Sequence, residues 1–116
     1  MSYKQWIDTN HLSHQTLGEE TIAEDVLSLF TAQAEDWKTL LRQAQETSSI
    51  ASLAHKMKGS ARGIGAFPLA GKADEVEQNP EDSMARQALL QHLNETCNYI
   101  NDHKPMLLSK IRAAND

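Results

Sequence analysis

Residues 53–66 read LAHKMKGSARGIGA, from Leu53 to Ala66. At about 100° per residue, a helix over these residues has two distinct faces. Its apolar face consists of Leu53, Met57, Ser60, Ala61 and Ile64. Its polar face consists of His55, Lys58, Gly59 and Arg62. We expect the apolar face to enter the core and the polar face to lie together in solvent. Because glycine inside a helix costs about 1 kcal/mol, we also expect something to approach Gly59 closely.

The same stretch carries a recognisable motif. The run His55-Lys56-Met57-Lys58-Gly59-Ser60-Ala61, followed by Ile64-Gly65-Ala66, resembles the signature of histidine-containing phosphotransfer (HPt) domains of multistep two-component relays. In that family the histidine accepts a phosphoryl group from an aspartyl phosphate on a receiver domain. The family fold is an antiparallel up-and-down four-helix bundle with a short N-terminal helix.

The resemblance implies a phosphotransfer intermediate without ATP-dependent kinase activity of its own. It would relay a phosphoryl group from a hybrid sensor kinase to a response regulator, and its partners would be their receiver domains. We expect no cofactor or metal ion to be bound by this chain, because the Mg²⁺ ion of the reaction is supplied by the receiver. We expect the protein to act as a monomer.

The chemistry of the residues supports the same roles. A neutral imidazole is well populated near pH 7 and is nucleophilic, so His55 is the predicted phosphoacceptor. Lys58, one turn further on, can place its ammonium group beside the phosphoryl oxygens. By resemblance, Gly59 leaves room for the loops of the receiver. The predicted partner-binding residues are Ala51, Ser52, Lys56, Gly59 and Arg62.

One position departs from the pattern of the family. Some members have a glutamine 22 residues after the histidine, where it contacts the phosphorylation site, and Glu77 occupies this position here. A carboxylate would repel a phosphoryl group. We therefore expect Glu77 to face away from His55 or to touch the rim of the partner.

Composition supports an all-α fold. The 116 residues include only five glycines and three prolines, with many Ala, Leu, Gln and Glu, and helices favour this alphabet. We predict one domain over residues 1–116 with a bundle core at about 19–104. A short helix ends near Gly18, and long helices follow at about 19–44 and 50–64. A third begins near Phe67, and a fourth begins at Asn79 and ends or kinks at Pro105.

The first long helix carries an amphipathic pattern over about seven turns. The predicted core row is Ile22, Val26, Leu29, Phe30, Gln33, Trp37, Leu40, Leu41 and Ala44. Trp37 lies on this row, so we interpret it as a core residue and not as a ligand-stacking one.

Charge and cysteine content exclude several other classes. A formal net charge of -5 argues against nucleic acid as the main partner, although Lys56, Lys58 and Arg62 form a basic island around His55. A single cysteine, Cys97, excludes an internal disulfide and suits a reducing compartment. With no long apolar run and no signal pattern, we predict a cytoplasmic protein that does not enter membranes.

Two alternatives stay open on the sequence. The chain could be the phosphoacceptor module of a chemotaxis-type histidine kinase, or a helical adaptor that binds a receiver without chemistry. A metal-binding bundle is disfavoured, because His11 and His14 lack neighbouring ligands. We interpret His92 and His103 as ordinary polar positions.

Overall fold

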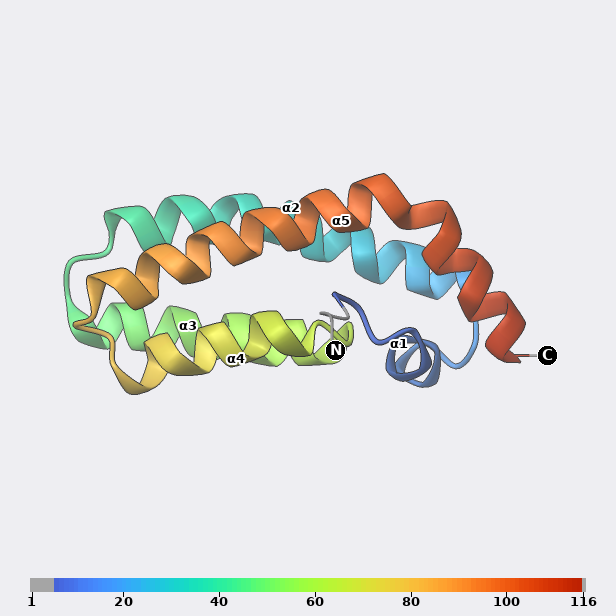
Figure 1. Ribbon diagram of the computed structural model, residues 1–116, viewed down its shortest axis with the longest axis horizontal. Coiled ribbons are helices and arrows are strands. Elements are labelled where there is room, and N and C mark those ends of the chain that lie inside the picture. The colour runs from blue at the N-terminus through green and yellow to red at the C-terminus, as the bar shows by residue number, and fades with distance from the viewer. Residues whose placement is uncertain (1–5, 116) are drawn as a thin grey trace, which may run out of the picture.

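The computed structural model describes the backbone of residues 6–115 and the side chains of residues 6–111. The helices are α1 (Thr9–Gln15), α2 (Glu20–Gln43), α3 (Thr47–Gly63), α4 (Phe67–Gln78) and α5 (Ser83–Asn115). Helices α2 to α5 run alternately up and down and form an antiparallel bundle (Figure 1). This confirms the predicted all-α fold, the four-helix bundle and the short N-terminal helix.

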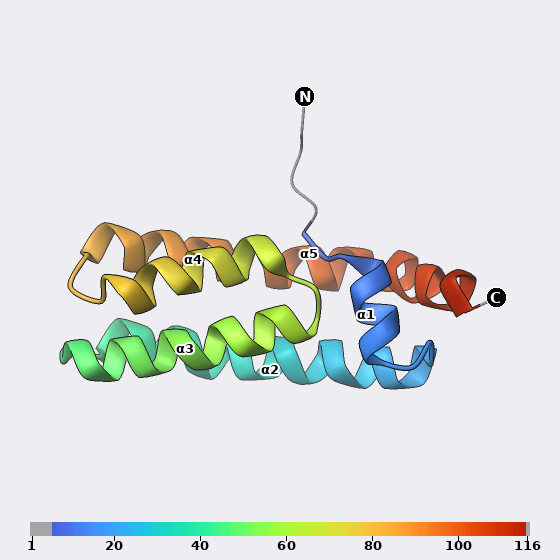
Figure 2. The ribbon, with the colours of Figure 1, turned by 90° about the horizontal axis from the view of Figure 1, so that it is seen from below.

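Helices α3 and α4 lie side by side, with α2 behind α3 and α5 behind α4 (Figure 2). The longer α2 and α5 extend past one end of this pair, and α1 lies beside that extension. The side chain of Asp8 caps α1 by accepting the backbone N–H of His11 at 3.0 Å. The leading helix therefore covers one end of the bundle.

The turn between α3 and α4 is fastened to the start of α1. The backbone N–H of Asp8 donates to the carbonyl oxygen of Gly65 at 2.8 Å. Gly65 has a φ of 81°, and a Cβ atom there would lie 2.6 Å from the Asp8 carbonyl oxygen. Only glycine fits this close left-handed turn. The prediction that α3 ends before Gly65 is confirmed.

The core contains apolar side chains from every helix. Its largest fully buried members are Phe30, Leu12, Leu27, Leu41, Ile50, Met57, Leu69, Leu89, Leu93, Ile100, Leu107 and Ile111. Trp37 is buried, as predicted, with its ring centroid 5.6 Å from that of Phe30. Among the described residues, no helix has the length and the apolar character needed to cross a bilayer.

The predicted core row of α2 was partly wrong. The buried residues of this helix are Ala23, Leu27, Phe30, Ala34, Trp37, Lys38 and Leu41. Four predicted members, Ile22, Leu29, Gln33 and Leu40, are exposed. The buried row includes the small Ala23 and Ala34, and in the sequence these positions look less like a core than the exposed Leu29 and Leu40 do. A second, unburied apolar row therefore lies along α2.

The expected start of α5 also needs correction, whereas one of the two predicted effects of Pro105 is found. Asp82, not Asn79, caps this helix, because its Oδ1 atom accepts the backbone N–H groups of Met84 and Ala85 at 3.0 and 3.1 Å. The helix does not end at Pro105 but continues to Asn115, and the bend in its C-terminal part accords with the predicted kink (Figure 1). Residues beyond the proline keep an apolar face against the core, which holds the helix together there.

His92 is likewise not an ordinary polar position. Its side chain is buried, and its ring centroid lies 5.0 Å from that of Trp6. The imidazole is therefore part of the contact between α5 and the segment before α1.

Candidate functional site

His55 lies in the middle of α3 with 67% of its side chain exposed. The opposite face of the helix is anchored in the core by Ile50, Ala54, Met57 and Ala61. Because this anchor fixes the rotation of the helix, the imidazole points into solvent. The predicted exposure of His55 is confirmed.

Glu77 of α4 contacts His55 directly. Its Oε2 atom lies 2.9 Å from Nδ1 of the imidazole. The expectation that Glu77 faces away from the histidine, or reaches only the rim of a partner, was therefore wrong. Helices α3 and α4 are antiparallel neighbours, and their packing brings residues 55 and 77 opposite each other.

This contact determines which nitrogen of the neutral His55 ring carries the proton. The hydrogen bond from Lys58, and then that from His55, lower the pKa of Glu77 below its ordinary value. An ionised carboxylate only accepts hydrogen bonds, so Nδ1 must carry the proton that it receives. In the neutral ring the lone pair then lies on Nε2. The geometry orients the imidazole with its nucleophilic nitrogen away from Glu77.

Lys58 is less exposed than the sequence indicated. Only 14% of its side chain is accessible, because the ammonium group turns towards α4. Its Nζ atom lies 2.6 Å from Oε1 of Glu77 and 3.1 Å from Oδ1 of Asp74. These hydrogen bonds raise the pKa of Lys58, with Glu77 the larger cause. Lys58 does not share a solvent strip with His55, and Glu77 joins the two side chains instead.

Asp74 is the member of this cluster that sequence reasoning missed. The hydrogen bond from Lys58 lowers the pKa of its carboxyl group. The spacing in the sequence could have indicated its proximity to Glu77, because Asp74 precedes Glu77 by three residues, which places both on one face of α4. The basic island predicted around His55 is thus partly neutralised by two carboxylates.

Gly59 opens the surface next to His55. A Cβ atom added there would meet no other atom within 4 Å, in accord with the expected clearance. Among the predicted partner-binding residues, Ser52, Lys56, Gly59 and Arg62 are exposed and Ala51 is half-buried.

Other histidines do not form a second centre. His14 is exposed, and the half-buried His11 packs edge-on against Phe67 with centroids 5.0 Å apart. Within residues 6–111, no three His, Cys, Asp or Glu side chains gather where they could hold a metal ion.

Comparison with protein families gives one match. The model of the Hpt domain matches residues 20–103, which is well over half of the chain. The chain belongs to the Hpt domain family. Comparison with curated proteins and with solved structures gave no significant match. Hpt domains are histidine phosphotransfer modules of phosphorelays, distinct from kinases, and they interact with receiver domains.

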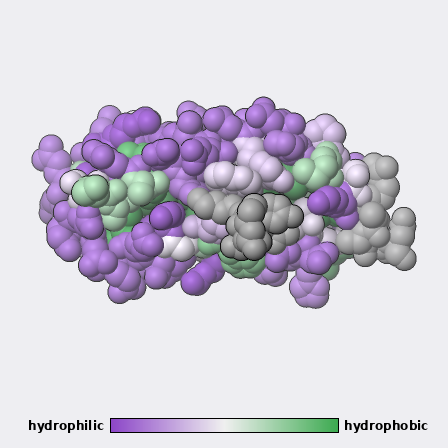
Figure 3. Space-filling view, viewed as in Figure 1, coloured by the Kyte–Doolittle hydropathy of each residue, from purple (hydrophilic) through white to green (hydrophobic). Residues whose placement is uncertain are grey.

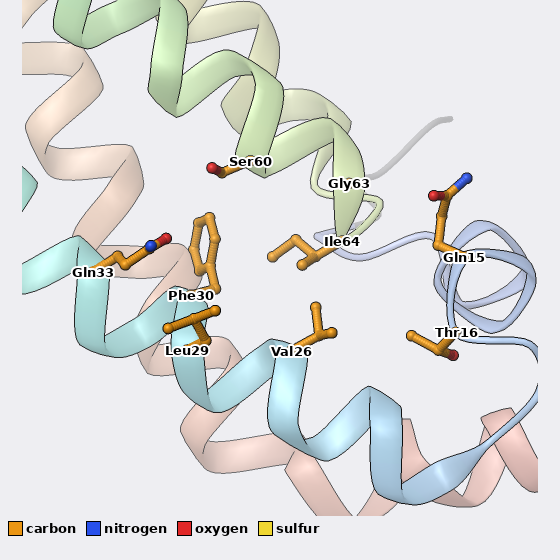
Figure 4. A pocket seen from close by; sticks show the side chains of 9 residues that line it. All are labelled: Gln15, Thr16, Val26, Leu29, Phe30, Gln33, Ser60, Gly63 and Ile64. Atoms are coloured by element: carbon orange, nitrogen blue, oxygen red, sulfur yellow. The ribbon is translucent and has the colours of Figure 1, made fainter.

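An apolar groove lies between α2 and the C-terminal part of α3, with the end of α1 closing one side. Figure 4 shows Val26, Leu29 and Phe30 of α2 facing Gly63, the last residue of α3, and Ile64, which follows it. The groove has a volume of about 280 Å³. Leu29 is 59% exposed at its edge. The unburied apolar row of α2 therefore forms one wall of a surface hollow.

A second hollow continues this surface towards the start of α3. It has a volume of about 500 Å³, and its wall includes Leu40 of α2 with Ser52 and Lys56 of α3. The opposite face of the Hpt domain, formed by α4 and α5, is mostly hydrophilic (Figure 3). Apolar surface is thus available on the α2–α3 side.

Proposed function

We propose that this Hpt domain relays a phosphoryl group between receiver aspartates through a phosphohistidine at His55. The observation that carries the proposal is the exposed imidazole whose Nδ1 atom is held by Glu77 at 2.9 Å. This arrangement leaves Nε2 free to meet an aspartyl phosphate from outside the bundle.

The transfer step is an in-line displacement at phosphorus. The lone pair of Nε2 forms the N–P bond while the P–O bond to the receiver aspartate breaks, and the aspartate leaves as a carboxylate. The ring becomes positively charged and keeps its Nδ1 proton, which the Glu77 carboxylate stabilises. In the second step a carboxylate of the next receiver attacks phosphorus, and Nε2 recovers its lone pair.

The other residues assist this step by charge and by shape. Lys58 supplies positive charge near the incoming phosphoryl oxygens, as an electrostatic stabiliser. Gly59 lies only about 40° around the helix from His55, towards the α2–α3 side, and leaves this path open. The receiver itself would hold the Mg²⁺ ion.

We further propose that the receiver docks over the α2–α3 side. Its apolar groove and the predicted partner residues Ser52, Lys56 and Gly59 lie on the side of α3 that leads from His55 towards α2. An exposed apolar hollow beside a reactive group is typical of an interaction site. Arg62 and Lys56 would contribute polar contacts at its rim.

The test is transfer of labelled phosphate from receiver domains of the same organism, each charged with radiolabelled acetyl phosphate. Wild type should take up an acid-labile, alkali-stable label. The His55→Gln variant should take up none, and the control His14→Gln, at another exposed histidine, should label like wild type. Equal receiver binding by wild type and His55→Gln with no label on either would instead indicate a non-catalytic adaptor.

A further inference from the structure

Asp74 lies in α4 one turn before Glu77. Because α3 and α4 are antiparallel, Glu77 lies opposite His55 and Asp74 lies opposite Lys58. Each pair is offset from the other by three residues on both helices. Asp74 therefore attracts the ammonium group of Lys58 along the helix axis, in the direction away from the imidazole.

The two carboxylates differ in how strongly they hold Lys58. Glu77 uses one oxygen for His55 and the other for Lys58, and its side chain is 23% exposed. Asp74 has the longer contact with Lys58, 3.1 Å, and is 46% exposed. Water can replace the ammonium group at an exposed carboxylate with little loss, and the positive charge of Arg62 also acts on Asp74. Asp74 is thus the partner that Lys58 can leave more easily.

On this basis, and resting on the proposed function, we propose that Asp74 is a positioning residue that retains Lys58 in the resting protein and releases it when His55 is phosphorylated. A phosphoryl group on Nε2 brings up to two negative charges close to Lys58. Its oxygens then compete with Asp74 for the ammonium group, while Glu77 keeps its bond to the imidazole. Part of the attraction between Lys58 and the phosphoryl group is consequently offset by the lost contact with Asp74.

The expected effect is a shift in the transfer equilibrium. Replacing Asp74 with asparagine removes the competing charge, so Lys58 is free to stabilise the phosphohistidine. The ratio of phosphorylated Hpt domain to phosphorylated receiver should rise about two- to fivefold, the range expected for one exposed ion pair.

The experiment measures this ratio at equilibrium for wild type and Asp74→Asn with one charged receiver. Glu75→Gln is the matched control, since Glu75 is the next residue of α4, is exposed and loses the same charge. A double-mutant cycle with Lys58→Met separates two causes. If Asp74 acts through Lys58, Asp74→Asn should have no effect in the Lys58→Met background.

A ratio for Asp74→Asn equal to that of wild type would overturn the role of Asp74, as would a rise of the same size in the Lys58→Met background or in Glu75→Gln. Circular-dichroism melting curves of all variants establish that the fold is retained. If wild type itself takes up no label, the proposed function fails, and that result is distinct from failure at Asp74.

Discussion

Replacing Gly59 with glutamine should make the protein more stable and a poorer phosphoryl acceptor. Gly59 lies inside α3, and a side chain there meets no atom within 4 Å. Glutamine is a good helix former, so the substitution should raise the free energy of unfolding by about 0.5–1 kcal/mol. For a chain of this length the midpoint of thermal unfolding should rise by about 2–6 °C.

The same side chain should obstruct the partner. It would project from the surface beside His55, in the space between the imidazole and the α2–α3 grooves. Because phosphoryl transfer depends on close alignment of the reacting atoms, we expect the single-turnover rate to fall about tenfold or more. Stability and transfer would then change in opposite directions, which a damaged fold cannot produce.

Gly71→Gln is the matched control. Gly71 lies in α4, is exposed and also has no atom within 4 Å of an added Cβ. It lies about 9 Å along the helix axis from Glu77, so its variant should gain stability without losing transfer. The assays are thermal unfolding by circular dichroism and rapid-quench transfer from a charged receiver. A wild-type rate for Gly59→Gln would refute the steric role of this glycine.

Three further predictions concern the site and its surroundings. Glu77→Gln should slow transfer about three- to tenfold. A neutral amide accepts the Nδ1 proton less strongly than a carboxylate and can also donate to that nitrogen. An unchanged rapid-quench rate would show that Glu77 does not set the tautomer of His55. Leu29→Ser should weaken receiver binding, measured by calorimetry, with little change in melting temperature. The control Met84→Ser, at a more exposed position on α5, should leave receiver binding intact. Equal effects of the two substitutions on receiver binding would contradict docking at the α2–α3 groove. Lys58 lowers the folded-state pKa of Glu77 below 4.5, so this ion pair stabilises the fold above that pH and its effect is lost as pH falls through the lowered value. The melting difference between wild type and Glu77→Gln should therefore shrink as the pH falls below about 4.5, and a constant difference would refute the ion-pair account.

The sequence was sufficient for those parts of the site that depend on one helix. Helical spacing places His55 opposite Met57 and Ala61, so burial of the apolar face fixes exposure of the imidazole. Gly59 follows from the same reasoning. These features need only the helical period and a core, and both can be read from one segment.

Contacts between helices could not be predicted from the spacing of residues within one helix. The expectation for Glu77 rested on repulsion between a carboxylate and a phosphoryl group, and it treated the imidazole as having one reactive side. The two ring nitrogens point in different directions, so Glu77 can hold Nδ1 while the phosphoryl group approaches Nε2. The inter-helix register that places Asp74 beside Lys58 is likewise set by packing of α3 on α4, which no single segment encodes.

The α2 helix shows a related limit. Its sequence contains two apolar rows, and large apolar residues of one row, including Leu29 and Leu40, lie on the surface. Close packing in the core selected the row that includes Ala23 and Ala34. Hydrophobicity alone does not distinguish a core row from a docking row, because apolar side chains suit both the interior of a bundle and an interface with a partner.

Phosphorus NMR, with mass spectrometry, of the Hpt domain after reaction with a charged receiver identifies the atom that carries the phosphoryl group. We predict one phosphoryl group on Nε2 of His55 and no phosphohistidine in the His55→Gln variant. Phosphate on Nδ1 of His55, on another residue, or still present in His55→Gln would contradict this prediction.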